Sequence, residues 1–146
     1  MFKTILIITV VTLFLVIALL HFYWALGGKW GVEGAIPEQF RTSYFRKENH
    51  FKVQLSTIIV AMGLCVFASI IGTHYLIDEG RVEAGYTTYI SWGIAAIFII
   101  RAIGDFNYVG MFKKYTDDKF YRNDTRIYVP LCLFIGIAIL AITIIE

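Results

Sequence analysis

Apolar residues are distributed along the chain in four long blocks, and most charged residues lie between the blocks. The blocks cover about residues 4–26, 53–77, 86–108 and 127–145. A helix needs about 20 predominantly apolar residues to cross roughly 30 Å of hydrocarbon, and each block reaches that length, the fourth only just. The pattern therefore predicts an all-α polytopic membrane protein, a four-helix transmembrane bundle that forms a single domain over residues 1–146.

The first block is expected to be retained as a membrane helix. It is longer than the apolar core of a signal peptide, which has about 7–15 residues. No small-x-small cleavage site precedes its polar end, where the sequence continues directly as HFYW at 21–24.

Composition supports a membrane location. Hydrophobic residues make up 58% of the chain and charged residues 16%, whereas soluble proteins have about 25% charged residues. The net charge of +2 is too small to indicate a nucleic-acid partner. We therefore expect membrane lipids to surround the protein.

Lysine and arginine residues are unevenly divided between the two sides of the predicted bundle. Ten lie in or beside the two long connections, namely Lys29, Arg41, Arg46, Lys47, Lys52, Lys113, Lys114, Lys119, Arg122 and Arg126. The opposite side has Lys3 and Arg81. Because cytoplasmic loops are enriched in these residues, we expect both long loops in the cytoplasm and both termini outside. Basic residues that bind a ligand would produce the same distribution.

The third block ends in a polar stretch, RAIGDFNYVG at 101–110. A charged side chain costs about 2.5–3.5 kcal/mol near the bilayer centre, and less toward the ends, unless it faces protein or water. On a helix, Arg101 and Asp105 would lie one turn apart and within reach of an ion pair. Tyr108 would continue that face, and Gly104 would let another helix approach closely. The pair is interpreted as a proton relay, a clamp for an anionic headgroup, or a structural ion pair held beside Asn107 and Tyr108.

Two other stretches reach the same membrane surface. His21 and Trp24 end the first block, and the fourth block begins after Asp124. His21 and Trp24 share a helical face with Gly28, so both are candidates for lining a pocket. The alternative is that the aromatic residues form an interfacial belt, which we favour for Tyr23. Three stretches converging at one level predict a polar site there.

The connection over residues 27–52 is long for a structureless loop. Residues 36–39 are predicted to open a short interfacial helix, with Phe40 and Tyr44 toward the headgroups. Basic residues would then reach anionic lipid, namely Arg41, Arg46 and Lys47. The segment is either a lid over the site or an amphipathic collar.

Small residues mark helix-packing faces. They are Ala61, Cys65, Ala68 and Gly72 in the second block, and Cys132 and Gly136 in the fourth. Such residues let helix backbones pack closely. Gln54, Ser56 and Thr57 are placed to add hydrogen bonds to the polar cluster, whereas His74 lies at the opposite end of the same block.

Several chemistries are absent from the sequence. It contains no P-loop, G-x-G-x-x-G, H-E-x-x-H or G-x-S-x-G motif. His21, His50 and His74 are too dispersed to show metal-ligand spacing, so we expect neither a metal nor a cofactor. Cys65 and Cys132 are not in a C-x-x-C motif, and we interpret both as small buried residues rather than a disulfide or redox pair.

Three ordered segments carry a family resemblance. They are HFYWALGGKWG at 21–31, RAIGDFNYVGMFK at 101–113 and DTRIYVPLCL at 124–133, with the patterns H-x-Y-W-A-L-G-G, R-A-x-G-D-F-x-Y-V-G and D-T-R-x-Y. They resemble an uncharacterised family of small four-helix bacterial membrane proteins, a domain of unknown function. The resemblance spans essentially the whole chain and implies a fold and a membrane location. It implies no activity and no catalytic residue.

The leading functional hypothesis is binding of a lipid or lipophilic small molecule near the cytoplasmic leaflet. Arg101 would hold a polar or anionic headgroup, Asp105 would orient it, and His21, Trp24, Asn107 and Tyr108 would complete the site. One alternative is a membrane enzyme of isomerase or reductase type, with Asp105 or His21 as the proton donor. Another is a structural subunit that binds a membrane-protein partner or a second copy of itself. A transporter is least favoured, because no acidic residue lies at the bilayer midplane.

Overall fold

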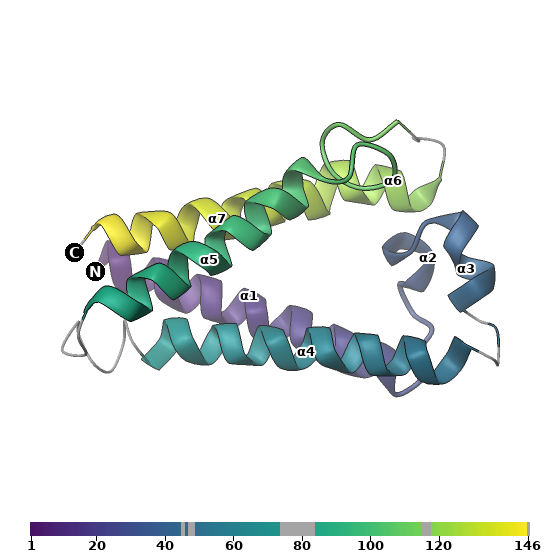
Figure 1. The fold of residues 1–146 in the computed structure, drawn as a ribbon, viewed down its shortest axis with the longest axis horizontal. Coiled ribbons are helices and arrows are strands. Elements are labelled where there is room, and N and C mark those ends of the chain that lie inside the picture. The colour runs from purple at the N-terminus through teal and green to yellow at the C-terminus, as the bar shows by residue number, and fades with distance from the viewer. Residues whose placement is uncertain (45, 47–48, 74–83, 115–117, 146) are drawn as a thin grey trace.

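The computed structural model describes residues 1–44, 46, 49–73, 84–114 and 118–145, and it contains helices and loops but no strand within those ranges (Figure 1). The long helices are α1 (Phe2–Ala25), α4 (His50–Gly72), α5 (Ala84–Ile103) and α7 (Val129–Ile144). Helix α6 (Lys119–Asn123) and a π-helical turn, η3 (Asp124–Tyr128), precede α7 and join it in one apolar segment over Lys119–Ile144. The short helices α2 (Val32–Ala35) and α3 (Glu38–Tyr44) lie between α1 and α4.

Four of these helical segments are long and apolar enough to cross a membrane. This confirms the predicted all-α class and indicates a multi-pass membrane protein. Large apolar side chains are exposed on the outer faces of the helices, as lipid contact requires. They include Ile5, Leu15 and Leu19 on α1, Ile59 and Val66 on α4, Ile97 and Ile100 on α5, and Ile137 on α7.

The long helices pack as two pairs, α1 with α4 and α5 with α7. The pairs are joined by contacts of α1 with α7 and of α4 with α5. Figure 1 shows the two pairs close together near the termini and spread apart toward the end that carries α2, α3 and α6. The two helix pairs therefore diverge toward the end at which the predicted polar stretches lie.

Phe14 of α1 lies at the centre of the core and is fully buried. Its ring centroid is 5.3 Å from that of Phe98 on α5 and 6.1 Å from that of Phe67 on α4. Because lipid tails are as apolar as these side chains, close packing rather than removal from water holds such helices together. One aromatic residue thus connects both helix pairs.

The predicted small-residue faces lie between helices. Ala61 and Ala68 of α4 are buried, and a Cβ added to Gly72 would lie 3.7 Å from Val11 of α1. Gly136 of α7 approaches α5 so closely that an added Cβ would lie 2.7 Å from Ile99. The cysteines, Cys65 and Cys132, are free thiols and only partly buried, rather than buried as expected.

The largest differences between the helix boundaries and the predictions are at two places. Helix α5 ends at Ile103 rather than at residue 108, because Gly104 takes a positive φ of 87° that ends the helix. The fourth segment begins at Lys119, eight residues before the predicted start at 127. The predicted end of the second helix at residue 77, and His74 with it, lie outside the described residues.

Candidate functional site

Residues 104–110 form a compact loop whose backbone conformation depends on two glycines and one aspartate. Gly104 and Gly110 have positive φ values of 87° and 97°, and Phe106 has a φ of 63°. An added Cβ on Gly104 would collide with the carbonyl oxygen of Val109, and one on Gly110 with that of Ile103. Only glycine combines this conformation with this approach without a clash.

Asp105 holds the loop together through hydrogen bonds to its backbone. Its Oδ1 accepts backbone N–H groups from Asn107 at 3.0 Å, Tyr108 at 2.7 Å and Val109 at 2.9 Å. Its own N–H donates to the carbonyl oxygen of Val109 at 3.1 Å. The hydrogen bond from Val109, followed by those from Tyr108 and Asn107, lowers the pKa of Asp105 below the ordinary aspartate value. Asp105 is therefore ionised at neutral pH and suited to fixing the loop rather than to donating a proton.

Arg101 pairs with Asp124, and not with Asp105. The prediction that Arg101 and Asp105 lie one turn apart on a helix is wrong, because Asp105 follows the end of α5 and turns into the loop. The Nη2 of Arg101 lies 3.0 Å from Oδ1 of Asp124, whose side chain is completely buried. Asp124 belongs to the DTRIY segment, so two of the three sequence motifs meet in this ion pair.

A second cation binds the same buried carboxylate. The Nζ of Lys113 lies 3.1 Å from Oδ2 of Asp124, which also accepts the N–H of Gly110 at 2.8 Å. Lys113 donates further to the carbonyl oxygen of Gly110 at 3.0 Å and to Oγ1 of Thr125 at 2.6 Å. We call Arg101, Lys113 and Asp124 the Asp124 cluster. It fastens the 104–110 loop to the start of the last membrane segment.

The connection between α1 and α4 is tied to the last segment. Arg41 donates to both carboxylate oxygens of Asp118, at 2.9 and 3.2 Å, and the N–H of Glu38 donates to the same side chain at 2.9 Å. The hydroxyl of Tyr128 donates to the carbonyl oxygen of Gly34 at 2.8 Å. We call these contacts the α2–α3 clamp.

The clamp changes the interpretation of the first loop. Arg41 was expected to reach anionic lipid, but it is bonded to Asp118. The ring of Phe40 lies edge-on to Tyr108 with centroids 5.4 Å apart and is still 48% exposed, so its predicted contact with headgroups stays a prediction. Arg46 is exposed, while Lys47 and the side chain of Tyr44 lie outside the described part of the chain.

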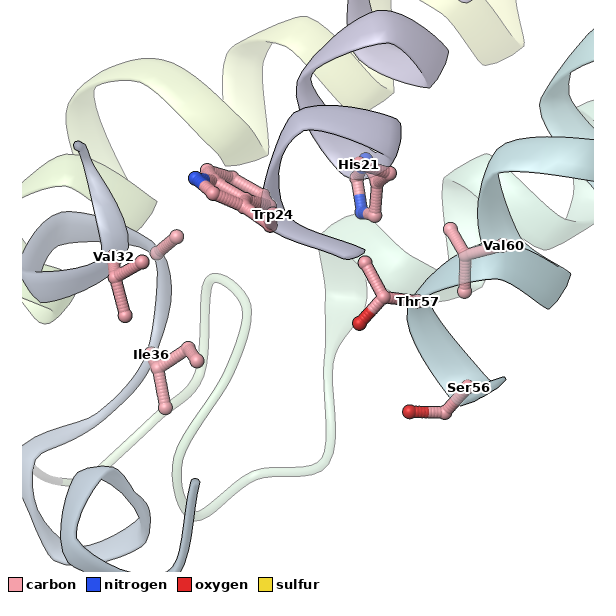
Figure 2. A pocket seen from close by; sticks show the side chains of 8 residues that line it. His21, Trp24, Val32, Ile36, Ser56, Thr57 and Val60 are labelled. Carbon is pink, nitrogen blue, oxygen red and sulfur yellow. The ribbon is translucent and has the colours of Figure 1, made fainter. Parts of the chain in front are cut away.

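A pocket of about 210 Å³ lies between the end of α1, the start of α4 and helix α2 (Figure 2). We call it the His21 pocket. Its lining residues are His21, Trp24, Val32, Ala35, Ile36, Ser56, Thr57 and Val60. Figure 2 shows that α1 provides one side, α4 a second, and Val32 and Ile36 a third.

Hydrogen bonds fix the polar lining of the pocket. His21 Nδ1 lies 2.8 Å from the carbonyl oxygen of Ile17 one turn earlier, and the His21 and Trp24 rings meet edge to face at 5.2 Å. Trp24 Nε1 donates to the carbonyl oxygen of Trp30 at 2.8 Å. The hydroxyls of Ser56 and Thr57 both bond to the carbonyl oxygen of Val53, at 2.9 and 2.7 Å.

The predicted site residues thus lie in three places. His21 and Trp24 line the pocket, as does the predicted hydrogen-bonding pair Ser56 and Thr57. Arg101 belongs to the Asp124 cluster, and the 104–110 loop holds the other three candidates, Asp105, Asn107 and Tyr108. Gln54 bonds instead to the carbonyl oxygen of Ala25 at 3.0 Å.

Sequence reasoning missed Asp124 and the α2 wall of the pocket. Asp124 lies shortly before the fourth apolar block, and an acidic residue at such a position needs a cation nearby. This was the available signal for Asp124. Val32, Ala35 and Ile36 carry no such signal, because apolar residues in a loop do not reveal what they cover. Within the described ranges, no three His, Cys, Asp or Glu side chains come together as metal ligands.

Comparison with known protein families shows a match over most of the chain. The profile of the family described as "Protein of unknown function (DUF3995)" matches residues 14–139, which include the His21 pocket and the Asp124 cluster. No curated protein and no solved structure matches the chain.

Proposed function

The chain belongs to this family of proteins of unknown function, and we propose that it binds a lipid or another lipophilic small molecule in the His21 pocket. The observation that carries the proposal is the lining of the pocket, in which apolar walls surround a few fixed polar groups. Ligand sites are built in this way, with apolar contacts for affinity and polar groups for orientation.

The size of the pocket limits what it holds. At about 210 Å³ it is smaller than typical ligand sites, which occupy about 300–1,000 Å³. It therefore suits a polar end and the adjoining part of a molecule. The remaining apolar part would lie along the exposed side of α4, where Val60 is 46% exposed and Ile59 is 62% exposed.

In this proposal the pocket faces the cytoplasmic leaflet. Support comes from the excess of lysine and arginine in the two long connections, which is typical of cytoplasmic loops. The ligand contacts are assigned to His21 and Trp24. The proposal assigns a structural role around the pocket to the other candidates, Arg101, Asp105, Asn107 and Tyr108. The side chains of Arg101 and Asp105 already form hydrogen bonds within the protein.

Native mass spectrometry of the mildly solubilised protein tests the proposal. Val60→Phe replaces a small aliphatic side chain of the pocket lining with a bulky ring. Val66→Phe makes the same change on the same helix, at a position that is 51% exposed and outside the lining. We expect a stoichiometric lipophilic molecule on the wild type and on Val66→Phe, with a much smaller bound fraction on Val60→Phe. Equal occupancy in all three proteins, or none in the wild type, would contradict the proposal.

The His21 ring also supports the alternative of a membrane enzyme acting on a lipophilic substrate. General acid–base catalysis by a positioned histidine contributes about 10²–10⁴-fold. With the molecule identified by mass spectrometry as substrate, His21→Gln would then lose turnover by about that factor but lose much less of its binding, because the glutamine amide oxygen can still accept a hydrogen bond. Unchanged turnover in His21→Gln would exclude this role for His21.

A further inference from the structure

The polar groups of the His21 pocket present hydrogen-bond acceptors, and we infer that the ligand is a lipophilic alcohol or phenol whose hydroxyl donates to them. This inference rests on the proposed function and specifies the chemistry of the same site. It depends on three side chains, His21, Ser56 and Thr57, and on the absence of formal charge in the lining.

The hydrogen bond of His21 determines what its ring offers to a ligand. The carbonyl oxygen of Ile17 can only accept, so the Nδ1 that lies 2.8 Å from it carries the hydrogen. In a neutral imidazole with hydrogen on Nδ1, Nε2 has a free lone pair and is an acceptor. Figure 2 shows a ring nitrogen of His21 directed toward the side of the pocket where Thr57 lies.

The two hydroxyls on α4 have the same character. A hydroxyl has one hydrogen and two lone pairs. Ser56 and Thr57 each direct that hydrogen to the carbonyl oxygen of Val53, which leaves their oxygens to accept. A ligand that could only accept would have to break one of these bonds before it gained one in return.

The charge of the lining favours a neutral ligand. In the part of the chain that the structure describes, none of the lining residues is Lys, Arg, Asp or Glu. A phosphate headgroup would lie there without a cation from the described lining, which includes neither Arg101 nor Lys113. An ammonium headgroup would lie there without a carboxylate. Burying an unpaired charge is strongly unfavourable, whereas a hydroxyl needs only the acceptors already present.

The apolar side chains of the lining favour an apolar remainder of the ligand. Val32, Ile36 and Val60 contribute only hydrocarbon, and the Trp24 indole has its N–H bonded to Trp30. The Trp24 ring thus presents an apolar surface suited to stacking against an aromatic or aliphatic group. Together these features match a hydroxyl at the end of a hydrophobic body.

A matched pair of probes tests the inference. 4-Octylphenol donates a hydrogen bond, whereas its methyl ether, 4-octylanisole, keeps the ring, the tail and the oxygen but cannot donate. We expect the wild-type protein in lipid nanodiscs to bind the phenol about tenfold more tightly than the ether, as measured by titration followed by native mass spectrometry.

Variants of α4 separate hydrogen bonding from the extra bulk of the ether. Thr57→Val removes the acceptor at nearly constant shape, and the preference for the phenol should fall severalfold, while Thr57→Ser should retain it. Thr73→Val is the matched control, because the Thr73 hydroxyl makes the same kind of bond, 2.7 Å to the carbonyl oxygen of Ser69, at the other end of α4. It should keep the full preference.

Three results would overturn the inference. One is equal or tighter binding of the ether, and another is a preference for the phenol that persists in full when Thr57→Val is combined with Ser56→Ala and His21→Phe. Both would leave the proposed lipophile binding intact. The third is binding of neither probe, which excludes the alcohol or phenol assignment, while occupancy in the Val60→Phe and Val66→Phe proteins decides separately whether the pocket holds a lipophilic molecule.

Discussion

At the scale of single residues, two aspartates near the end of α5 have opposite environments. Asp105 is exposed and accepts three backbone N–H groups, whereas Asp124 is buried between two cationic side chains. Removing the charge of Asp124 would leave Arg101 and Lys113 facing each other without an anion. Removing that of Asp105 would only weaken a turn.

We expect Asp124→Asn to lower the free energy of unfolding by about 3–5 kcal/mol, the usual effect of breaking a buried ion pair from one side. Thermal unfolding in detergent measures it. Glu33→Gln is the control, because Glu33 is 69% exposed and lies 3.7 Å from Lys119. Its effect should stay below about 1 kcal/mol. Equal losses in the two variants would show that the Asp124 cluster contributes no more than a surface pair.

The lowered pKa of Asp105 predicts a pH dependence of stability. A carboxylate whose pKa is lower in the folded than in the unfolded chain stabilises the fold when it is ionised in both states. That contribution is lost as the pH falls from the unfolded value of about 3.9 through the folded pKa. Asp105→Asn should therefore have a lower melting temperature than the wild type at pH 7, and the difference should shrink below about pH 4. A difference that is constant between pH 7 and pH 3 would contradict this.

At this scale the sequence indicates that Arg101 needs an anion but does not identify which one. Placing Asp105 on the helix follows from extending the apolar block to residue 108. The composition of residues 104–110, with glycine at both ends and Asp105 and Asn107 between, is typical of a turn and was the available signal against a helix. Asp124 is distant in sequence, so its role depends on the packing of α5 against the last segment.

At the scale of helices, Gly136 sets how closely α7 approaches α5. A Cβ at this position would lie 2.7 Å from Ile99 and 3.1 Å from the carbonyl oxygen of Ala95. The side chain of Ile99 can move, but the backbone of Ala95 moves only with the helix. The glycine is therefore a packing requirement rather than a source of flexibility.

Gly136→Leu should push α7 from α5 and destabilise the protein by about 1–3 kcal/mol, the usual range for overpacking. Gly63→Leu is its control, since an added Cβ on Gly63 meets nothing within 4 Å. Unfolding in detergent should show a clear loss for the first variant and little change for the second. Similar stability of both proteins would mean that α5 and α7 do not require this close approach.

Helices and their contact faces are the part of this fold that the sequence predicts best. Long apolar blocks define the four membrane segments, and small residues at helical spacing indicate where Ala61, Ala68 and Gly136 lie against a neighbour. Which helices pair is not predicted, because every block has an apolar surface all round. The π-helical turn at Asp124–Tyr128 also lacks a periodic signal.

At the scale of the whole molecule, the α2–α3 clamp connects the two helix pairs where they spread apart. Asp118 receives both the Arg41 guanidinium and the N–H of Glu38, and Gly34 receives the Tyr128 hydroxyl. The clamped segment carries Val32 and Ile36, which form one wall of the His21 pocket. The pocket thus depends on contacts outside its own lining.

Releasing the clamp should open the pocket without unfolding the bundle. Arg41→Gln removes the charge pair with Asp118, and we expect amide hydrogens of residues 32–44 to exchange at least severalfold faster, while those in the middle of α1 and α4 do not change. Arg46→Gln, at an exposed position, should alter neither. Unchanged exchange in Arg41→Gln would show that the other contacts suffice to hold the segment.

The clamp also determines when the His21 pocket can form during biosynthesis. The partners in the Tyr128–Gly34 bond are separated by 94 positions and those in the Glu38–Asp118 bond by 80, so a ribosome releases α2 long before its anchor exists. Helices α1 and α4 can already associate in the membrane at that stage, but the third wall of the pocket has nothing to hold it. A nascent chain therefore lacks the complete His21 pocket until its last membrane segment has been inserted. If the pocket binds a lipophilic molecule as proposed, occupancy would stabilise only finished molecules against quality-control proteases.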